Sequence, residues 1–226
     1  MIHSSLTEKA FSVLKSSDPI KKCFLTFEIF EKYYNKKIEH IGSPFDIIKP
    51  ERPEKPLLLP PKFMPRRRAL TKASSRSALI HSLAHIELNA IDLAWDIIAR
   101  YSDQKLPPKF YNDWISVARD EASHFLILSK RLKELDIKYG DLNAHDGLWN
   151  AAMITKNSLI KRLAIIPMYF EARGLDISPE MIVKLIKVDD LRSAKCLKRI
   201  YIDEIRHVKI GEYWFKWACK REKIDP

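Results

Sequence analysis

The sequence is poor in glycine, in strand-like alternation and in paired cysteines. Only 5 of its 226 residues are glycine, and stretches that alternate apolar with polar residues are scarce. Tight turns rely on glycine and half-buried strands on a period of two, so both a turn-rich fold and a mainly β fold are disfavoured. These absences favour a mostly helical protein.

The 3 cysteines are far apart in the chain and form no CxxC pair. We expect them to be reduced, which indicates a cytoplasmic protein. Residues 1–19 hold no apolar stretch long enough for a signal peptide. The most apolar helical stretch, residues 79–99, is interrupted by acidic and histidine side chains, so we expect no membrane span.

The formal net charge is +11 at pH 7. Lysines and arginines spread over a surface attract phosphate at long range, so an RNA partner is one interpretation. The other interpretation is that lysine serves as the default solvated side chain and that no polyanion is involved.

The N-terminal third differs from the rest of the chain. Ser5 and Glu8 form a capping box that begins a short helix, and Asp18 with Pro19 begins a second helix that runs to about residue 37. These helices form an extension over residues 1–45. Six of the 13 prolines then fall between residues 50 and 65, which excludes helix and predicts an extended strap over residues 46–70. The strap contains the basic run Arg66-Arg67-Arg68.

From about residue 71 the apolar residues recur with the period of an α-helix. Long helices are predicted at residues 73–101, 108–136, 146–173 and 190–220, and a shorter one runs from the Ser178-Pro179 cap to about residue 187. We expect breaks at residues 106–108, at 139–141 and at Gly174. Four long helices predict an all-α, four-helix bundle over residues 71–226.

The motif Asp-Glu-x-x-His occurs twice, as Asp120-Glu121-Ala-Ser-His124 and as Asp203-Glu204-Ile-Arg-His207. Positions i and i+3 of a helix project from one face, so the Glu and His of each motif can bind the same ion. A single ExxH is more often an exposed ion pair. The aspartate that precedes both glutamates makes coincidence less plausible.

Two further glutamates lie within apolar helical stripes. Glu87 has Leu83 and Ile91 four residues away on either side, and Glu171 has Pro167 and Leu175. A lone carboxylate on a core-facing stripe is costly unless it is paired, protonated or bound to a cation. Neighbouring arginines are one source of such pairing: Arg119, Arg173 and Arg206.

The spacing of these acids suggests a duplicated helix pair. Glu87 precedes Glu121 by 34 residues and Glu171 precedes Glu204 by 33. Each half supplies one Glu and one Glu-x-x-His, which is the ligand set of two-metal carboxylate bundles. The predicted metal ligands are Glu87, Glu121, His124, Glu171, Glu204 and His207. Carboxylate and imidazole ligation without thiolate favours two iron ions, with manganese as the alternative and zinc as a less expected one.

Asp120 and Asp203 are candidates to accept the remaining N–H of the ligand imidazoles across the site. The alternative is that both are ordinary helix-surface charges. His81 and His85 lie six and two positions before Glu87 and point away from its face, so we expect both to be core or second-layer histidines rather than ligands.

At these residues the chain resembles a ferritin-like family known mainly as a domain of unknown function, itself similar at a distance to the tRNA-hydroxylating di-iron monooxygenases. The resemblance covers about residues 44–215 and includes Leu59-Pro-Pro-Lys-Phe-Met-Pro-Arg-Arg, Ala84-His-Ile-Glu-Leu-Asn-Ala-Ile-Asp92, Tyr139-Gly-Asp-Leu-Asn-Ala-His-Asp-Gly-Leu-Trp149 and Tyr201-Ile-Asp-Glu-Ile-Arg-His207. It implies the ferritin-like fold and supports the six ligands position by position. It supplies no substrate.

The predicted activity is that of an O2-activating di-iron oxidoreductase, such as a hydroxylase or monooxygenase. Its substrate would be a small molecule or RNA, and an oxygenase would also need an electron donor. Two alternatives remain open, namely iron handling by ferroxidase or storage activity, and a stress protein whose metals are structural. We expect a monomer or a dimer without a membrane partner.

Overall fold

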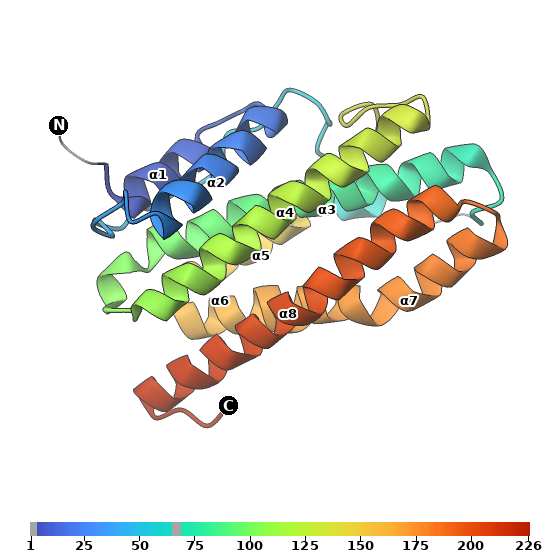
Figure 1. Cartoon of the computed structure of the whole chain (residues 1–226). Helices are drawn as coiled ribbons and strands as arrows, with labels where there is room; N and C mark the ends of the chain where they lie inside the picture. Colours follow the sequence, from blue (N-terminus) through green and yellow to red (C-terminus); the bar gives the residue numbers. More distant parts are fainter. Residues whose placement is uncertain (1–3, 65–68) are drawn as a thin grey trace. The chain divides into compact units, whose positions relative to one another are not determined.

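The computed structural model describes residues 4–64 and 69–226, and within them the protein is all-α. Its α-helices are α1 (Leu6–Leu14), α2 (Pro19–Tyr34), α3 (Ala73–Arg100), α4 (Pro108–Glu134), α5 (Gly147–Ile154), α6 (Leu159–Ile165), α7 (Ala172–Lys187) and α8 (Leu191–Glu222) (Figure 1). Short 3-10 helices span Pro61–Phe63 and Ser102–Gln104, and a π-helix, Ile166–Glu171, joins α6 to α7. The predicted fold class is confirmed. No helix in the described ranges is both long and apolar enough to cross a membrane.

Both predicted N-terminal caps are present. The Ser5 hydroxyl accepts a hydrogen bond from the backbone N–H of Glu8 at 3.2 Å, and the Glu8 carboxylate accepts from the backbone N–H of Ser5 at 2.7 Å. The Asp18 carboxylate accepts from the backbone N–H groups of Ile20 and Lys21 at 2.8 and 3.1 Å. These caps satisfy N–H groups that have no partner within a helix, which is why α1 and α2 begin where they do.

The chain forms two compact units. Unit 1 comprises the described residues of Met1–Lys55 and His85–Leu126, and unit 2 comprises those of Pro56–Ala84 and Ile127–Pro226. Because the boundaries fall inside α3 and α4, each of these helices contributes residues to both units.

In unit 1, α2 and the segment that follows it are fixed against α3. The indole N–H of Trp95 donates to the Thr26 hydroxyl at 2.9 Å, which joins α3 to α2. The backbone N–H of Phe45 donates to the Ala99 carbonyl at 3.1 Å, and the Arg100 guanidinium donates to the Ile47 carbonyl at 2.5 Å. Since these groups are buried, each of their hydrogen bonds offsets a desolvation cost.

In unit 2, the C-terminal end of α4 is tied to the start of α8. The Arg131 guanidinium donates to the Ser193 hydroxyl and to the Asp190 carboxylate, both at 2.9 Å. Asp190 also caps α8 through the backbone N–H of Ser193 at 3.0 Å. One aspartate therefore fixes both the beginning of α8 and its position on α4.

The proline-rich stretch is not α-helical in its described part, as predicted. Its only helical turn there is the 3-10 segment Pro61–Phe63. Leu58 forms an isolated parallel bridge with Ala144, in which the Leu59 N–H donates to the Ala144 carbonyl at 2.8 Å. The run Arg66–Arg68 lies outside the described residues.

The predicted long helix at residues 146–173 was wrong. It is divided into α5 and α6 at residues 155–158. The Thr155 hydroxyl donates to the Ala151 carbonyl at 2.9 Å, and the Ser158 hydroxyl caps α6 by accepting from the Lys161 N–H at 3.3 Å. Such short polar side chains offer the backbone partners that compete with a continuous helix.

The predicted break at Gly174 and cap at Ser178-Pro179 were also wrong, because both positions lie inside α7. A glycine inside a helix costs only about 1 kcal/mol, and α7 recovers this by packing Met181 and Leu185 in the core of unit 2. The Ser178 hydroxyl donates to the Gly174 carbonyl at 2.7 Å instead of capping a new helix.

Gly211→Ala is expected to destabilise the protein by about 1–3 kcal/mol. A Cβ at residue 211 would lie 2.3 Å from the Cβ of Pro167, whose ring is held in the π-helix. Gly174→Ala is the matched control, because a Cβ there meets nothing within 4 Å. It should stabilise α7 by about 0.5–1 kcal/mol. Urea denaturation of the two variants measures both effects, and equal changes would contradict the close approach of Gly211 to Pro167.

Candidate metal centre

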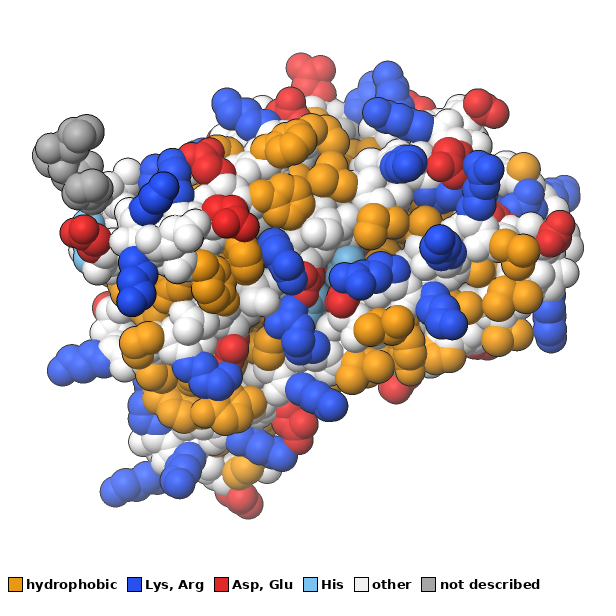
Figure 2. Space-filling model, viewed as in Figure 1, with side chains coloured by type: hydrophobic (Ala, Val, Ile, Leu, Met, Phe, Trp, Pro, Cys, Tyr) orange, Lys and Arg blue, Asp and Glu red, His pale blue; other side chains and the backbone are white. Residues whose placement is uncertain are grey.

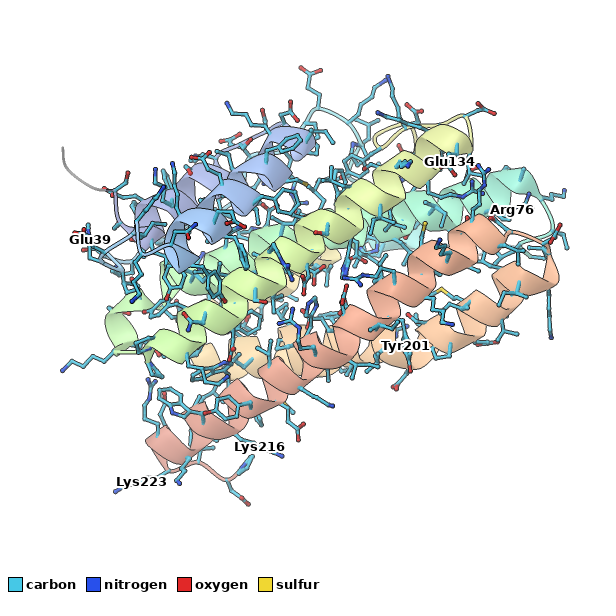
Figure 3. All side chains as sticks on the ribbon, in the orientation of Figure 1. Glu39, Arg76, Glu134, Tyr201, Lys216 and Lys223 are labelled. Atoms are coloured by element: carbon cyan, nitrogen blue, oxygen red, sulfur yellow. The ribbon has the colours of Figure 1, made fainter. Side chains whose placement is uncertain are left out.

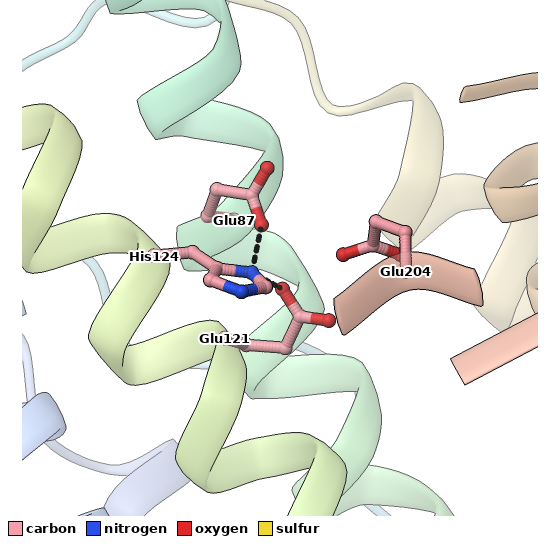
Figure 4. A group of neighbouring side chains, drawn as sticks. All are labelled: Glu87, Glu121, His124 and Glu204. Carbon is pink, nitrogen blue, oxygen red and sulfur yellow. Dashed lines mark hydrogen bonds and ion pairs between the residues drawn. The ribbon is translucent and has the colours of Figure 1, made fainter. Parts of the chain in front are cut away.

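α3 and α4 bring three of the predicted ligands together within unit 1. The Nδ1 atom of His124 lies 3.2 Å from Oε2 of Glu87 and 3.5 Å from Oε2 of Glu121. Glu121 and His124 lie one turn apart on α4, and Glu87 reaches them from α3 (Figure 4). One ligand atom from each of the three lies within 4.8 Å of the others, so they can hold a metal ion.

These three side chains are almost completely buried. Glu87 is 5 % exposed, Glu121 is 1 % exposed and His124 is fully buried. Burial raises the pKa of Glu87 well above its ordinary value of 4.5, and the neighbouring Glu121 carboxylate raises it further. The hydrogen bond from His124 acts in the opposite direction. Two carboxylates in one buried place therefore call for a positive charge or a proton between them.

The donor set fits a first-row transition metal. Two carboxylate oxygens and one imidazole nitrogen converge without any thiolate, a combination that suits iron or manganese. The sequence located these residues because each glutamate lies within an apolar stripe. Val117 and Phe125, four residues on either side of Glu121, are both buried as that pattern predicts.

The other three predicted ligands belong to unit 2. On α8, the Nδ1 atom of His207 lies 3.3 Å from Oε1 of Glu204, so this Glu-x-x-His pair has the same local geometry as the pair on α4. His207 is fully buried. Glu171 is the last residue of the π-helix and is half-buried.

The π-helix is a feature that the sequence did not predict. Pro167, its second residue, approaches α8 closely at Gly211. A π-helix inserts a wide turn into a helix and often occurs where a functional side chain must be placed. Glu171 is therefore the last residue of a wide turn inside a continuous run of helix. The predicted break at Gly174 had instead placed it in the last turn of a helix.

Asp120 and Asp203, the two candidates for orienting the imidazoles, each contact an arginine of their own helix. Arg119 forms an ion pair with Asp120, which is buried. The Arg199 guanidinium lies 3.1 Å from the carboxylate of Asp203. Their contact with the ligand imidazoles stays a prediction.

His81 and His85 are core residues, as predicted. The Nε2 atom of His81 accepts a hydrogen bond from the backbone N–H of Gly140 at 3.0 Å, and its ring stacks on Tyr139. Burial lowers the pKa of His81, which keeps Nε2 available as an acceptor. His85 contacts the side chain of Asn89 at 3.1 Å.

Unit 1 also contains a buried charge network one turn beyond Glu87. Asp92 is fully buried and forms an ion pair with Lys22 of α2, whose side chain is 2 % exposed. The Arg52 guanidinium lies 3.7 Å from the same carboxylate and donates to Asn89. The corresponding aspartate of the second half, Asp176, is exposed. The two halves are therefore alike in their Glu-x-x-His pairs and different at these aspartates.

Comparison with known proteins places the chain in a family and gives no activity. A family model described as "Protein of unknown function (DUF455)" matches residues 15–226. A relative from Haemophilus influenzae (strain ATCC 51907 / DSM 11121 / KW20 / Rd), described as "Uncharacterized protein", is 36% identical over 225 residues, which cover 95% of this chain and 77% of the relative. No solved structure matches the chain.

Proposed function

Because this chain belongs to the family described as "Protein of unknown function (DUF455)", we propose its function from its own residues: it is a two-metal carboxylate oxidoreductase that activates O2. Iron is the expected metal and manganese the alternative. The observation that carries the proposal is the buried convergence of Glu87, Glu121 and His124. Structural ion pairs rarely place two carboxylates and an imidazole together in a core.

In this proposal both halves of the chain contribute to one site. Each half supplies an isolated Glu and a Glu-x-x-His pair, and the imidazole Nδ1 faces the glutamate in both pairs. The proposed ligands are Glu87, Glu121, His124, Glu171, Glu204 and His207. The four-helix, ferritin-like arrangement implied by the sequence is part of the same proposal.

Two irons held by these carboxylates would supply electrons to O2, which is the chemistry that hydroxylation needs. The protein residues hold the ions and control the protons around them. Buried apolar neighbours such as Val117 and Phe125 keep water from the carboxylates of unit 1. Asp120 and Asp203 are proposed to orient the imidazoles, so that Nδ1 and not Nε2 is presented to the site. An external electron donor is then required for turnover.

The function is tested by loading the metal-free protein anaerobically with Fe(II) and then admitting O2. We expect a Mössbauer spectrum of paired, non-haem iron that changes on exposure to O2, with O2 consumed in proportion to iron. A size-exclusion profile of a monomer or dimer is expected as well. A cage-sized particle that accumulates iron far beyond two ions per chain would instead indicate iron storage. Bound iron that does not react with O2 would indicate a structural role for the metal.

Metal affinity should rise with pH because metal binding displaces a proton from Glu87. The pKa of this buried carboxyl is raised well above 4.5, so the metal-free site retains a proton at a pH where an exposed glutamate has lost it. A ligand must be ionised, so affinity should rise by up to about tenfold per pH unit below the raised pKa and level off above it. Calorimetric Mn(II) titrations in buffers of different ionisation enthalpy measure the proton release. Binding that is independent of pH and releases no proton would contradict this role for Glu87.

A further inference from the structure

The exposed side of α8 carries a basic face. It consists of Lys195, Lys198, Arg199, Arg206, Lys209, Lys216 and Lys220. At 100° per residue these seven positions fall within a sector of about 100°, and the face extends for about 38 Å along the helix. Every acidic residue of α8 projects outside this sector. Figure 2 shows Lys and Arg side chains recurring along this part of the surface, and Figure 3 labels Lys216 within it.

More than half of these cations have no ion-pair partner among the described residues. Arg199 pairs with Asp203 at 3.1 Å and Lys216 pairs with Glu212 at 2.6 Å, both at the margins of the sector. Among the described residues, the four remaining lysines form no ion pair: Lys195, Lys198, Lys209 and Lys220. A solvated helix surface commonly interleaves both signs of charge, which reduces self-repulsion. Like charges repeated along one face are unfavourable unless a polyanion binds there.

The same sector exposes an aromatic ring between the cations. Tyr213 is 49% exposed and follows Lys209 by one turn. Exposed aromatic rings within a basic track are what single-stranded nucleic acids need, because bases stack on the ring while the phosphates meet the cations. A helix that lies in a membrane interface would instead bury a continuous apolar face. The apolar residues of the sector are separated by lysines and arginines, so the membrane is the less suitable partner.

We propose that this α8 basic face binds the phosphate backbone of a single-stranded nucleic acid, with Tyr213 stacking on a base. Glu204 and His207 project from the opposite, more buried side of the same helix, so binding involves none of the proposed metal ligands. The interaction can therefore be measured on metal-free protein.

The test is fluorescence anisotropy of a labelled 20-nucleotide single-stranded RNA with the full-length, metal-free chain. We expect binding in the range of about 1–100 µM near physiological salt, weakening steeply as salt increases. The triple variant Lys195→Gln, Lys209→Gln, Lys220→Gln should weaken binding at least about tenfold. It should also reduce the salt slope by about 2, since each lost phosphate contact in a single strand contributes about 0.7.

The matched control removes the same charge from exposed lysines of unit 1, as Lys21→Gln, Lys37→Gln, Lys49→Gln. This variant should bind RNA within about twofold of wild type, because it leaves every phosphate contact on α8 intact. Tyr213→Ala should weaken binding to RNA at least about fivefold and leave binding to inorganic polyphosphate unchanged. Circular dichroism checks that each variant is folded.

Three results would overturn the proposal. One is equal weakening by the two triple variants, which would mean that net charge alone attracts RNA. Another is the absence of RNA binding at low salt. The third is binding of the chain to phosphatidylserine vesicles but not to RNA, which would assign the face to a membrane. None of these results depends on whether the protein binds iron.

Discussion

Glu87→Gln should make the metal-free protein more stable while it removes metal binding. The carboxyl of Glu87 is buried beside Glu121, and its raised pKa means that ionising it in the folded state is costly. Glutamine keeps the shape and removes the charge. We expect a gain of about 1–3 kcal/mol in the free energy of unfolding, together with a loss of at least about 100-fold in metal affinity.

The stability gain should depend on pH in a defined direction. A folded-state pKa above the unfolded value of about 4.5 means that the folded protein binds the proton more tightly. The metal-free wild type should therefore lose stability as pH rises from about 4.5 through the raised pKa, and Glu87→Gln should lack this loss. Urea denaturation at several pH values, without metal, measures the difference.

The control is Glu39→Gln, which changes an exposed glutamate of unit 1 (Figure 3). It should leave both metal binding and stability near wild type. If Glu87→Gln destabilised the metal-free protein, Glu87 would be a structural residue that forms favourable contacts, and its place in a metal centre would lose its main support.

Asp92→Ala should destabilise the protein more than any of the other single substitutions. It removes the carboxylate that neutralises Lys22 in the core of unit 1 and that the Arg52 guanidinium approaches at 3.7 Å. Breaking a buried pair on one side leaves an uncompensated charge, which costs about 3–5 kcal/mol. Thermal and urea denaturation of the variant measure the loss.

The double variant Lys22→Met, Asp92→Leu distinguishes charge from packing. It replaces the pair with apolar side chains of similar size, and such replacements are commonly neutral or better. We expect it to recover most of the stability that Asp92→Ala loses. A double variant as unstable as Asp92→Ala would show that the pair is required for more than mutual neutralisation.

Local signals in the sequence predicted much of the fold. Two helix starts were predicted from residues whose side chains satisfy helix N–H groups, namely the capping box at Ser5 and the Asp18-Pro19 cap. Both caps are present in the structure. The helices that carry Glu87 and Glu121 were predicted to within two residues at their ends, because their apolar period is long and uninterrupted. The prolines correctly excluded α-helix from the described part of the strap.

The errors arose where tertiary packing overrides a local preference. Gly174 and Pro179 are typical of helix ends, yet α7 continues through both because its apolar face is buried. The π-helix before it is only six residues long, and over so few residues the pattern of apolar side chains does not distinguish a π-helix from an α-helix. The sequence located the acids of unit 1 by their apolar stripes, but it could not show that Lys22, 70 residues away from Asp92, would neutralise that carboxylate.

The number of Fe(II) ions bound per chain tests the central claim most directly. Anaerobic titration of the metal-free protein, followed by metal analysis after gel filtration, should give two ions in the wild type. It should give fewer than two in both Glu121→Ala and Glu204→Ala, because the proposed site draws one Glu-x-x-His pair from each half of the chain. A wild-type protein that binds no iron, or one whose iron content is unaffected by Glu204→Ala, would contradict a single two-metal centre built from both halves.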